Sequence, residues 1–181
     1  MVRRYSPEPL ASEQLERILE KARRHPSAGF SQGIHFVLIT DPARRLELAR
    51  LAGEDAYAAR GFERWLSVAP AQVVLAASQA DYEGRYAEAD KSGTDDWSVP
   101  YWWVDAGAAL MLLLLAAAEE GLGAGFLGAH RLVGLKELLN LPEGVHPVGL
   151  VTLGHPLSDR PSSSLKRGRR ALSELVHRER W

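Results

Sequence analysis

One apolar segment constrains the fold of this chain more than any other. Residues 106–118 are all Ala, Gly, Leu or Met, with Asp105 before them and two glutamates after them. The segment belongs to a longer helical pattern over 101–121, which Gly121 and Gly123 are expected to end. The apolar run falls short of the roughly 18 residues that a membrane span needs. We therefore expect a helix that is buried, either in a protein core or between subunits.

The rest of the chain alternates between strand and helix patterns. The expected strands are 34–40, 71–77, 125–129 and 145–154, and the expected helices are 12–24, 42–52, 55–66, 101–121 and 132–141. Ser12 is the expected cap of the first helix. One apolar stripe of that helix comprises Leu15, Ile18, Leu19 and Ala22. Residues 81–100 are charged, aromatic and poorly periodic, which predicts a long surface excursion. Interleaved strands and helices indicate an α/β or α+β fold.

Composition narrows the kind of protein. At 181 residues the chain is expected to form one domain, 1–181, with a sizeable core. Its formal net charge of −1 gives no pull toward nucleic acid or an anionic membrane. It has no cysteine, and its six histidines lack a metal-site spacing, so we expect neither disulfides nor a metal. The first residues lack the apolar stretch of a signal peptide, which favours a cytoplasmic protein.

The segment from His25 to Gly33 carries the strongest local indication of binding. It joins the first helix to the first strand through Pro, Ser, Ala and Gly, which let the backbone turn sharply and leave N–H groups open to a ligand. Gln32 adds a side-chain amide that both donates and accepts. Such a loop can hold the polar edge of a flat ligand. A tight turn without a ligand explains the same residues, so both interpretations stay open on local chemistry alone.

Residues 123–128 match the dinucleotide fingerprint GxGxxG letter for letter. That fingerprint needs a strand before it and a helix after it, whereas here a long helix comes first. An acid near the expected distance, Glu143, follows a helix end and not a second strand. We therefore interpret these glycines as a helix stop and as points of close backbone approach, not as a Rossmann site.

Six segments in a fixed order carry a family resemblance: 3–7, 26–36, 105–116, 121–128, 141–156 and 169–181. They resemble, in turn, the N-terminal Arg-rich segment, the Pro-Ser-Ala…Gln loop, the central helix, the Gly-Leu-Gly…Gly strand, the last core strand and the Arg-Arg…His…Trp tail of the nitroreductase family of FMN-dependent oxidoreductases. The resemblance implies an α+β fold with a mostly antiparallel central sheet flanked by helices, in an intertwined homodimer. It also implies two FMN sites at the dimer interface, with loops from both subunits and a C-terminal tail that reaches across.

The resemblance assigns cofactor-binding roles to particular residues. Arg167 and Arg169 match the basic pair that binds the FMN phosphate, with Lys166 or Arg170 in their place if the register slips by one. Arg3 matches the basic residue at the polar edge of the ring, where a positive group stabilises the reduced flavin anion. The full implied set is Arg3, Arg4, Pro26, Ser27, Ala28, Gly29, Gln32, Leu127, Gly128, Arg167 and Arg169. An ordinary solvated basic run is the alternative interpretation of 166–170.

The implied activity is an NAD(P)H-dependent reduction of a nitroaromatic, quinone or similar acceptor. A hydride would pass through flavin N5 in a ping-pong cycle, so no catalytic side chain is required. The aromatic residues expected to roof the substrate pocket are Trp97, Tyr101, Trp102 and Trp103; ordinary packing in a core or an interface is the alternative. Some relatives clamp an amino-acid zwitterion with a lid, and residues of those types occur here at a loose spacing, at Glu83, Tyr86, Glu88 and Lys91.

The chain departs from the family pattern in the loop and at its start. Phe30 stands where the family usually has Asn, and Gly33 where it usually has Pro. The family's first Arg and its Ser, which help to bind phosphate, would lie at or before Met1. These differences leave open a non-catalytic dimer on the same fold, which would bind flavin weakly or not at all and act as a sensor or binding module. A specialised relative, such as a flavin-fragmenting or reductive dehalogenating enzyme, is a further alternative.

Overall fold

The computed structural model describes residues 1–91, 98–159 and 162–181 and is built around an antiparallel sheet of four strands in the order β1-β2-β4-β3. The strands are β1 (Ile34–Ile39), β2 (Ala71–Ser78), β3 (Gly123–Gly128) and β4 (Val145–Gly154). The α-helices are α1 (Ser12–Ala22), α2 (Pro42–Leu51), α3 (Glu54–Ala58), α4 (Gln79–Tyr86), α5 (Tyr101–Glu119) and α6 (Leu135–Leu139). The expected α+β class, with an antiparallel sheet flanked by helices, is confirmed.

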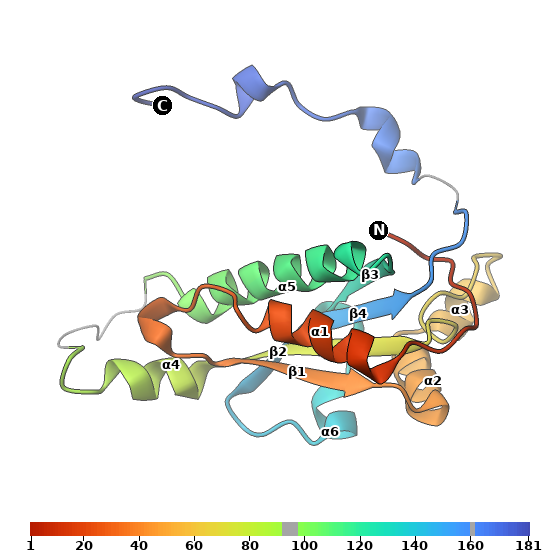
Figure 1. Ribbon diagram of the computed structural model, residues 1–181, viewed down its shortest axis with the longest axis horizontal. Coiled ribbons are helices and arrows are strands. Elements are labelled where there is room, and N and C mark those ends of the chain that lie inside the picture. The colour runs from red at the N-terminus through yellow and green to blue at the C-terminus, as the bar shows by residue number, and fades with distance from the viewer. Residues whose placement is uncertain (92–97, 160–161) are drawn as a thin grey trace.

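Helices cover both faces of the sheet. α1 and α5 lie on one face, and α2 and α6 lie on the other (Figure 1). Every residue of β2 is buried, because β1 and β4 flank it and helices cover it from both sides. This enclosure explains why β2 is apolar without interruption over residues 73–77 although its neighbours are antiparallel.

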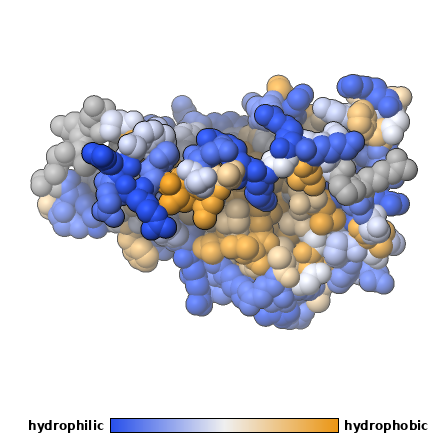
Figure 2. Space-filling model, turned by 90° about the horizontal axis from the view of Figure 1, so that it is seen from above, coloured by the Kyte–Doolittle hydropathy of each residue, from blue (hydrophilic) through white to orange (hydrophobic). Residues whose placement is uncertain are grey.

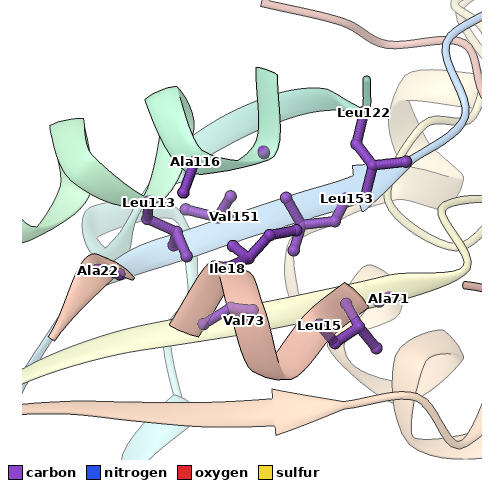
Figure 3. Close-up of a cluster of buried hydrophobic side chains, with 11 residues drawn as sticks. Leu15, Ile18, Ala22, Ala71, Val73, Leu113, Ala116, Leu122, Val151 and Leu153 are labelled. Atoms are coloured by element: carbon purple, nitrogen blue, oxygen red, sulfur yellow. The ribbon is translucent and has the colours of Figure 1, made fainter. Parts of the chain in front are cut away.

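The core between α1, α5 and the sheet is built from small and branched apolar side chains. In Figure 3, Ile18 of α1 and Leu113 of α5 lie close to Val151 of β4. The apolar stripe predicted for the first helix is confirmed, since Leu15, Ile18 and Ala22 are buried and Leu19 is half-buried. Burying a Leu or Ile side chain contributes about 1.5–3 kcal/mol, so this cluster holds α1 and α5 to the sheet.

The central helix α5 is buried on one side only. Ala106, Ala109 and Leu113 are fully buried, whereas Met111 and Leu115 are 53% and 57% exposed. Seen from above, the molecule shows apolar surface gathered in the middle of this face (Figure 2). By length and composition α5 could cross a membrane, a test that the core helix of a soluble protein also passes. Its packing on α1 and β2 accounts for its apolar face as core.

Three predicted elements differ in the structure. The helix expected over 55–66 ends at Ala58, because Gly61 turns with a φ of 84° and the Glu54 carboxylate accepts backbone N–H bonds from Trp65 and Leu66. The helix expected over 132–141 is limited to α6, which lies between left-handed residues at Gly134 and Asn140. The excursion expected over 81–100 begins with α4 instead, whose cap is Ser78 accepting from the Asp81 N–H.

Of two smaller expectations, the helix cap at Ser12 is wrong and the rejection of a Rossmann site is confirmed. Ser12 is the first helical residue and not the cap; the cap position is Ala11, which makes no side-chain hydrogen bond. The 123–128 glycine pattern forms β3 itself, preceded by α5 and paired antiparallel with β4. The rejection of a Rossmann site is therefore confirmed, because the required strand–turn–helix arrangement does not exist there.

Candidate functional site

The loop between α1 and β1 is a tightly organised turn. Its centre is a short 3-10 helix, Ala28–Phe30. The Ser27 hydroxyl accepts a hydrogen bond from the Gln32 N–H at 2.8 Å, and the Ser31 hydroxyl donates to the Ala28 carbonyl at 2.7 Å. Gly29, Phe30 and Gln32 all have positive φ, of 60°, 60° and 55°. Positive φ at non-glycine residues costs free energy and concentrates at ligand sites, so this loop is a candidate site on backbone geometry as well as on composition.

Residues outside the loop hold it in this shape. A buried carboxylate oxygen of Asp105, on α5, accepts from the Ala28 N–H at 2.8 Å and from the Tyr82 hydroxyl at 2.7 Å. Arg85, on α4, donates from Nε to the Gly29 carbonyl at 2.9 Å. The Tyr86 ring lies so close to Gly29 that an added Cβ would come within 2.6 Å of it. Sequence reasoning considered Tyr86 only as part of a lid and did not assign Asp105, Tyr82 or Arg85 to the site, although a lone carboxylate at the start of an apolar helix was a visible signal.

The support also accounts for one departure from the family pattern. A Cβ on Gly33 would lie 2.8 Å from the Tyr82 ring and 2.9 Å from the Ser78 carbonyl oxygen. Tyr82 is fully buried, and its hydroxyl faces Asp105. A residue larger than glycine is therefore excluded at position 33 because the tyrosine occupies the space. Phe30, the other departure, is 73% exposed at the tip of the loop.

The N-terminal segment crosses the opposite end of the sheet. The Val2 N–H donates to the Ala124 carbonyl of β3, and Tyr5 forms a bridge with Pro156. The buried Tyr5 hydroxyl bonds Thr152 at 2.7 Å, and burial raises the pKa of that hydroxyl to about 12 against the lowering effect of the Thr152 bond. This anchor fixes the start of the chain to the end of the sheet.

The two predicted arginines of that segment differ in their surroundings. Arg4 is engaged, since its guanidinium pairs with Glu63 at 3.0 Å and donates to the Ser158 carbonyl at 2.9 Å. Arg3 bonds through its backbone N–H to Asp159, and its side chain is exposed. Of the two, Arg3 has the guanidinium that is available to a ligand in the described part of the chain.

Leu127 and Gly128 form the last two residues of β3, an edge strand. They pair with Leu150 and Gly149 of β4. Gly149 has to be glycine for close packing, because an added Cβ would lie 2.4 Å from Phe126 and 2.5 Å from the Leu127 carbonyl oxygen. Gly149 thus lets β4 approach the end of β3 closely, and at the other end of β3 the N-terminal segment bonds Ala124 through the Val2 N–H.

Arg167 and Arg169 lie on a C-terminal arm, which we define as residues 162–181. Every residue from 163 to 181 is exposed, and the arm extends from the end of β4 back over α5 without folding onto the body (Figure 1). Within the described chain no hydrogen bond engages either guanidinium, whereas the neighbouring Arg170 pairs with Glu174 at 3.0 Å. The arm also exposes large apolar side chains, including Leu172 at 75% and Trp181 at 100%.

One protomer does not bring these groups together. The loop adjoins Ile34, which pairs through Ala77 with His146 of β4, whereas the N-terminal segment joins β3 at the level of Leu153. Seven residues of β4 therefore separate the two levels, about 23 Å at ~3.3 Å per residue. Across the sheet, the loop and the end of β3 lie at opposite edge strands, about 14 Å apart at ~4.8 Å per strand. The expected cofactor residues thus form separate groups in one chain.

The predicted pocket aromatics are also divided. Tyr101 and Trp103 are 45% and 44% exposed at the start of α5, and the Trp103 ring lies 6.0 Å from that of His146. Trp102 is buried and packs edge-on against Tyr82 at 6.1 Å. It therefore supports the loop region from within the core, while Tyr101 and Trp103 face outward. Trp97 lies outside the described residues.

The charged side chains on and just after α4 contact other groups of the protein. Glu83 accepts from Gln79, and Arg85 pairs with Glu88 and Asp90, which lowers the pKa of Asp90 to about 2. Lys91 lies over the Tyr86 ring. Among the described residues there is no cluster of His, Cys, Asp or Glu that could hold a metal ion.

Comparison with known proteins places this geometry in a family. The family model described as Nitroreductase family matches residues 1–155. An FMN reductase [NAD(P)H] of Bacillus subtilis is 31% identical over 186 residues, covering 99% of this chain and 70% of that protein. The chain belongs to the nitroreductase family.

Solved structures show the same fold. The structure of B. megaterium NfrA2 superposes with a TM-score of 0.78 and 28% identity, over 99% of this chain and 70% of that one. The NADPH:FMN oxidoreductase from Vibrio harveyi, complexed with NAD+, gives a TM-score of 0.73 and 26% identity, over 99% and 73% of the two chains. The fold predicted from the resemblance is therefore confirmed by relatives that extend beyond this chain.

Proposed function

We propose that the protein is an FMN-dependent oxidoreductase that takes reducing equivalents from NADH or NADPH and passes them to a nitroaromatic, quinone or similar acceptor. The observation that carries the proposal is the loop from Pro26 to Gln32, whose unusual backbone is held by buried partners. In sequence the loop resembles the flavin loop of the family to which the chain belongs, and it lies within the residues that the family model matches. Relatives named FMN reductase and NADPH:FMN oxidoreductase support the same cofactor and the same class of electron donor.

The donor set fits FMN. A dianionic phosphate is best bound by permanently charged, planar donors, and Arg3, Arg167 and Arg169 have exposed guanidiniums. The loop supplies the exposed Gln32 side-chain amide for the polar edge of a ring. Its backbone N–H groups at Ala28, Phe30, Ser31 and Gln32 are bound within the protein, contrary to the open N–H groups expected from the sequence. When bound, FMN supplies the hydride chemistry, so the protein needs no side-chain nucleophile. The tasks left to this chain are to bind the phosphate, to hold the ring and to keep water away from it.

The separation of the loop from Arg3 favours a site made by two copies of the chain. The loop and the N-terminal segment that carries Arg3 lie at opposite ends and opposite edges of one sheet. The exposed apolar face of α5 and the apolar side chains of the arm offer surfaces that a second copy would bury (Figure 2). We therefore propose an intertwined homodimer in which the arm of each subunit lies on its partner, each site combining residues of both chains.

The acceptor is proposed to bind near the start of α5. Tyr101 and Trp103 expose flat rings there, and aromatic rings stack on flat electron acceptors. In this proposal Trp102 forms the wall behind them through its contact with Tyr82. The functional unit would be the whole chain, 1–181, as one domain that includes the arm, working in the cytoplasm.

The test is the visible spectrum of the purified protein, first as isolated and then titrated with FMN. We expect flavin absorbance with about one FMN per chain, bleached by NADH or NADPH without oxygen and restored by a quinone or a nitroaromatic. Flavin binding without bleaching would favour the sensor or binding-module alternative. A protein that neither carries nor takes up FMN would contradict the proposal.

A further inference from the structure

A buried carboxylate at the start of α5 has no partner of opposite charge among the described residues. Asp105 is only 5% exposed, and its Oδ2 atom accepts two hydrogen bonds, one from a backbone amide and one from a tyrosine hydroxyl. Burying a carboxylate costs free energy unless hydrogen bonds compensate it. A leucine or alanine would be cheaper at a position that only packs against its neighbours. The buried carboxylate is therefore best explained by the two groups that donate hydrogen bonds to it, the Ala28 N–H and the Tyr82 hydroxyl.

What Asp105 holds is the loop. The Ala28 N–H is bound from the α5 side, and the Gly29 carbonyl is bound by Arg85 from the α4 side. Two successive residues are thus fixed at two points, immediately before the positive-φ residue Phe30. Backbone conformations of this kind persist only where the surroundings over-determine them. Without the Asp105 contact, Ala28 would keep a buried or half-buried donor without an acceptor, and the turn would lose one of its two outside anchors.

Tyr82 completes the arrangement. Its ring fills the space over Gly33, and its hydroxyl donates to the same Asp105 oxygen that binds Ala28. Burial, helped by the hydrogen bond to Asp105, raises the pKa of the Tyr82 hydroxyl well above its ordinary value. The tyrosine therefore remains a donor at every ordinary pH, and it keeps the carboxylate oxygen aimed at the loop.

We propose that Asp105 is a positioning residue that sets the loop from Pro26 to Gln32 in its flavin-binding shape before the cofactor arrives, with Tyr82 orienting the carboxylate. This inference rests on the proposed function, because it takes the loop to be part of the FMN site. It goes beyond that function by assigning the affinity for FMN in part to a buried residue on another element. Pre-ordering a loop improves binding by removing the entropy cost of ordering it on contact.

Two substitutions at one position separate positioning from packing. Asp105→Asn keeps an oxygen that can accept both hydrogen bonds, whereas Asp105→Leu keeps the bulk and removes the acceptor. We expect Asp105→Leu to weaken FMN binding roughly tenfold or more and Asp105→Asn to change it by less than about threefold. The matched control is Glu120→Leu, at the far end of the same helix, which removes ion pairs to Arg17 and Lys21 and should leave FMN affinity unchanged.

The readouts are the FMN dissociation constant, measured well below the melting temperature of each variant, and amide hydrogen exchange of residues 26–32 without flavin. Faster exchange of the Ala28 amide in Asp105→Leu, but not in Asp105→Asn, would support the inference together with the affinity pattern. Wild-type affinity and wild-type exchange in Asp105→Leu would overturn it and leave the proposed function intact. Failure of the wild-type chain to bind FMN would overturn both, and it would be seen before any variant is made.

Discussion

The loop between α1 and β1 and the C-terminal arm are opposites in how they are held. The loop is fixed by its own protomer through Asp105, Arg85 and the internal bonds of Ser27. The arm makes no comparable contact, since all its residues from 163 onward are exposed and its ion pair, between Arg170 and Glu174, is internal. Yet the arm exposes more large apolar side chains than a solvated tail needs, among them Leu172 and Trp181.

The loop and the arm therefore differ in which chain provides their contacts. One part of the proposed site is made by folding, and it is ready in a single chain. The arm has the arginines and apolar side chains that a site needs, but it does not pack on its own protomer. We propose that the surface on which it packs belongs to a second copy of the chain. Obligate dimers behave in this way, since their interfaces resemble a core cut in half.

The largest expected effect comes from removing the arm. A chain that ends at Ser162 keeps the contacts of Leu157 and Ser158 with Arg4, so the fold of the protomer should survive. We expect it to lose dimerisation and at least a hundredfold in FMN affinity, because the two arginines proposed to bind the phosphate and much of the proposed interface are gone. Light scattering gives the mass, and absorbance gives the flavin content. A truncated chain that still forms a dimer and binds FMN would contradict the proposed role of the arm.

The next effect concerns the phosphate. Replacing Arg167 and Arg169 by alanine is expected to weaken FMN binding tenfold or more for each, at about 1.5–3 kcal/mol per charge-assisted hydrogen bond. Riboflavin, which lacks the phosphate, should bind the variants as it binds the wild type. Arg170→Ala is the control, because that guanidinium is engaged by Glu174. Equal losses for FMN and riboflavin would show that the two arginines act through folding and not through phosphate.

A glycine pair sharpens the role of the loop. Gly29 and Gly53 both have positive φ, of 60° and 74°, but an added Cβ meets the Tyr86 ring at 2.6 Å only in the first case. Both alanine variants should lose about 1 kcal/mol of unfolding free energy from backbone strain. Only Gly29→Ala is expected to weaken FMN binding, by several-fold. If Gly53→Ala weakens it as much, the effect reports stability and not loop geometry.

The smallest effect on flavin is expected at the N-terminal anchor. The pKa of Tyr5 is about 12 in the folded protein against an ordinary value of 10, so the neutral hydroxyl stabilises the fold below pH 10. That stabilisation is lost as the pH rises from 10 to 12, up to about 2.7 kcal/mol for two pKa units. Melting temperatures between pH 8 and pH 12 should fall less steeply in Tyr5→Phe than in the wild type. Parallel curves would contradict the assignment to Tyr5.

Sequence reasoning predicted the framework well because strong periodic signals specify it. The mainly apolar segments of β2 and β4 and the apolar stripe of α1 could each be identified from the local pattern. The boundaries of α3 and α6 were wrong because distant groups set them: Glu54 binds the backbone of residues 65–67, and Asn140 adopts a left-handed conformation. Neither the Glu54 contacts nor the Asn140 conformation produces a periodic pattern in the sequence.

The candidate site was predictable in composition but not in construction. The loop residues were identifiable from their turn chemistry, and the arginines from the family pattern. Asp105, Tyr82 and Arg85 were not assigned to the site, because the hydrogen bonds that join Asp105 and Arg85 to the loop cross 77 and 56 positions of sequence, and Tyr82 acts on the loop through Asp105. The wide separation of the loop from the segment with Arg3 in one chain likewise follows only from the sheet register.

The most direct test of a site shared between two chains is complementation in a mixed dimer. Gly29→Ala damages the loop and Arg167→Ala with Arg169→Ala damages the arm, and each variant alone should bind FMN more weakly than the wild type at every site. If loop and arm meet across the interface, a heterodimer of the two variants has one intact site and should bind one FMN per two chains with wild-type affinity. If loop and arm of the same chain form the site, both sites of the heterodimer are damaged, and the absence of any tight FMN site would contradict the account.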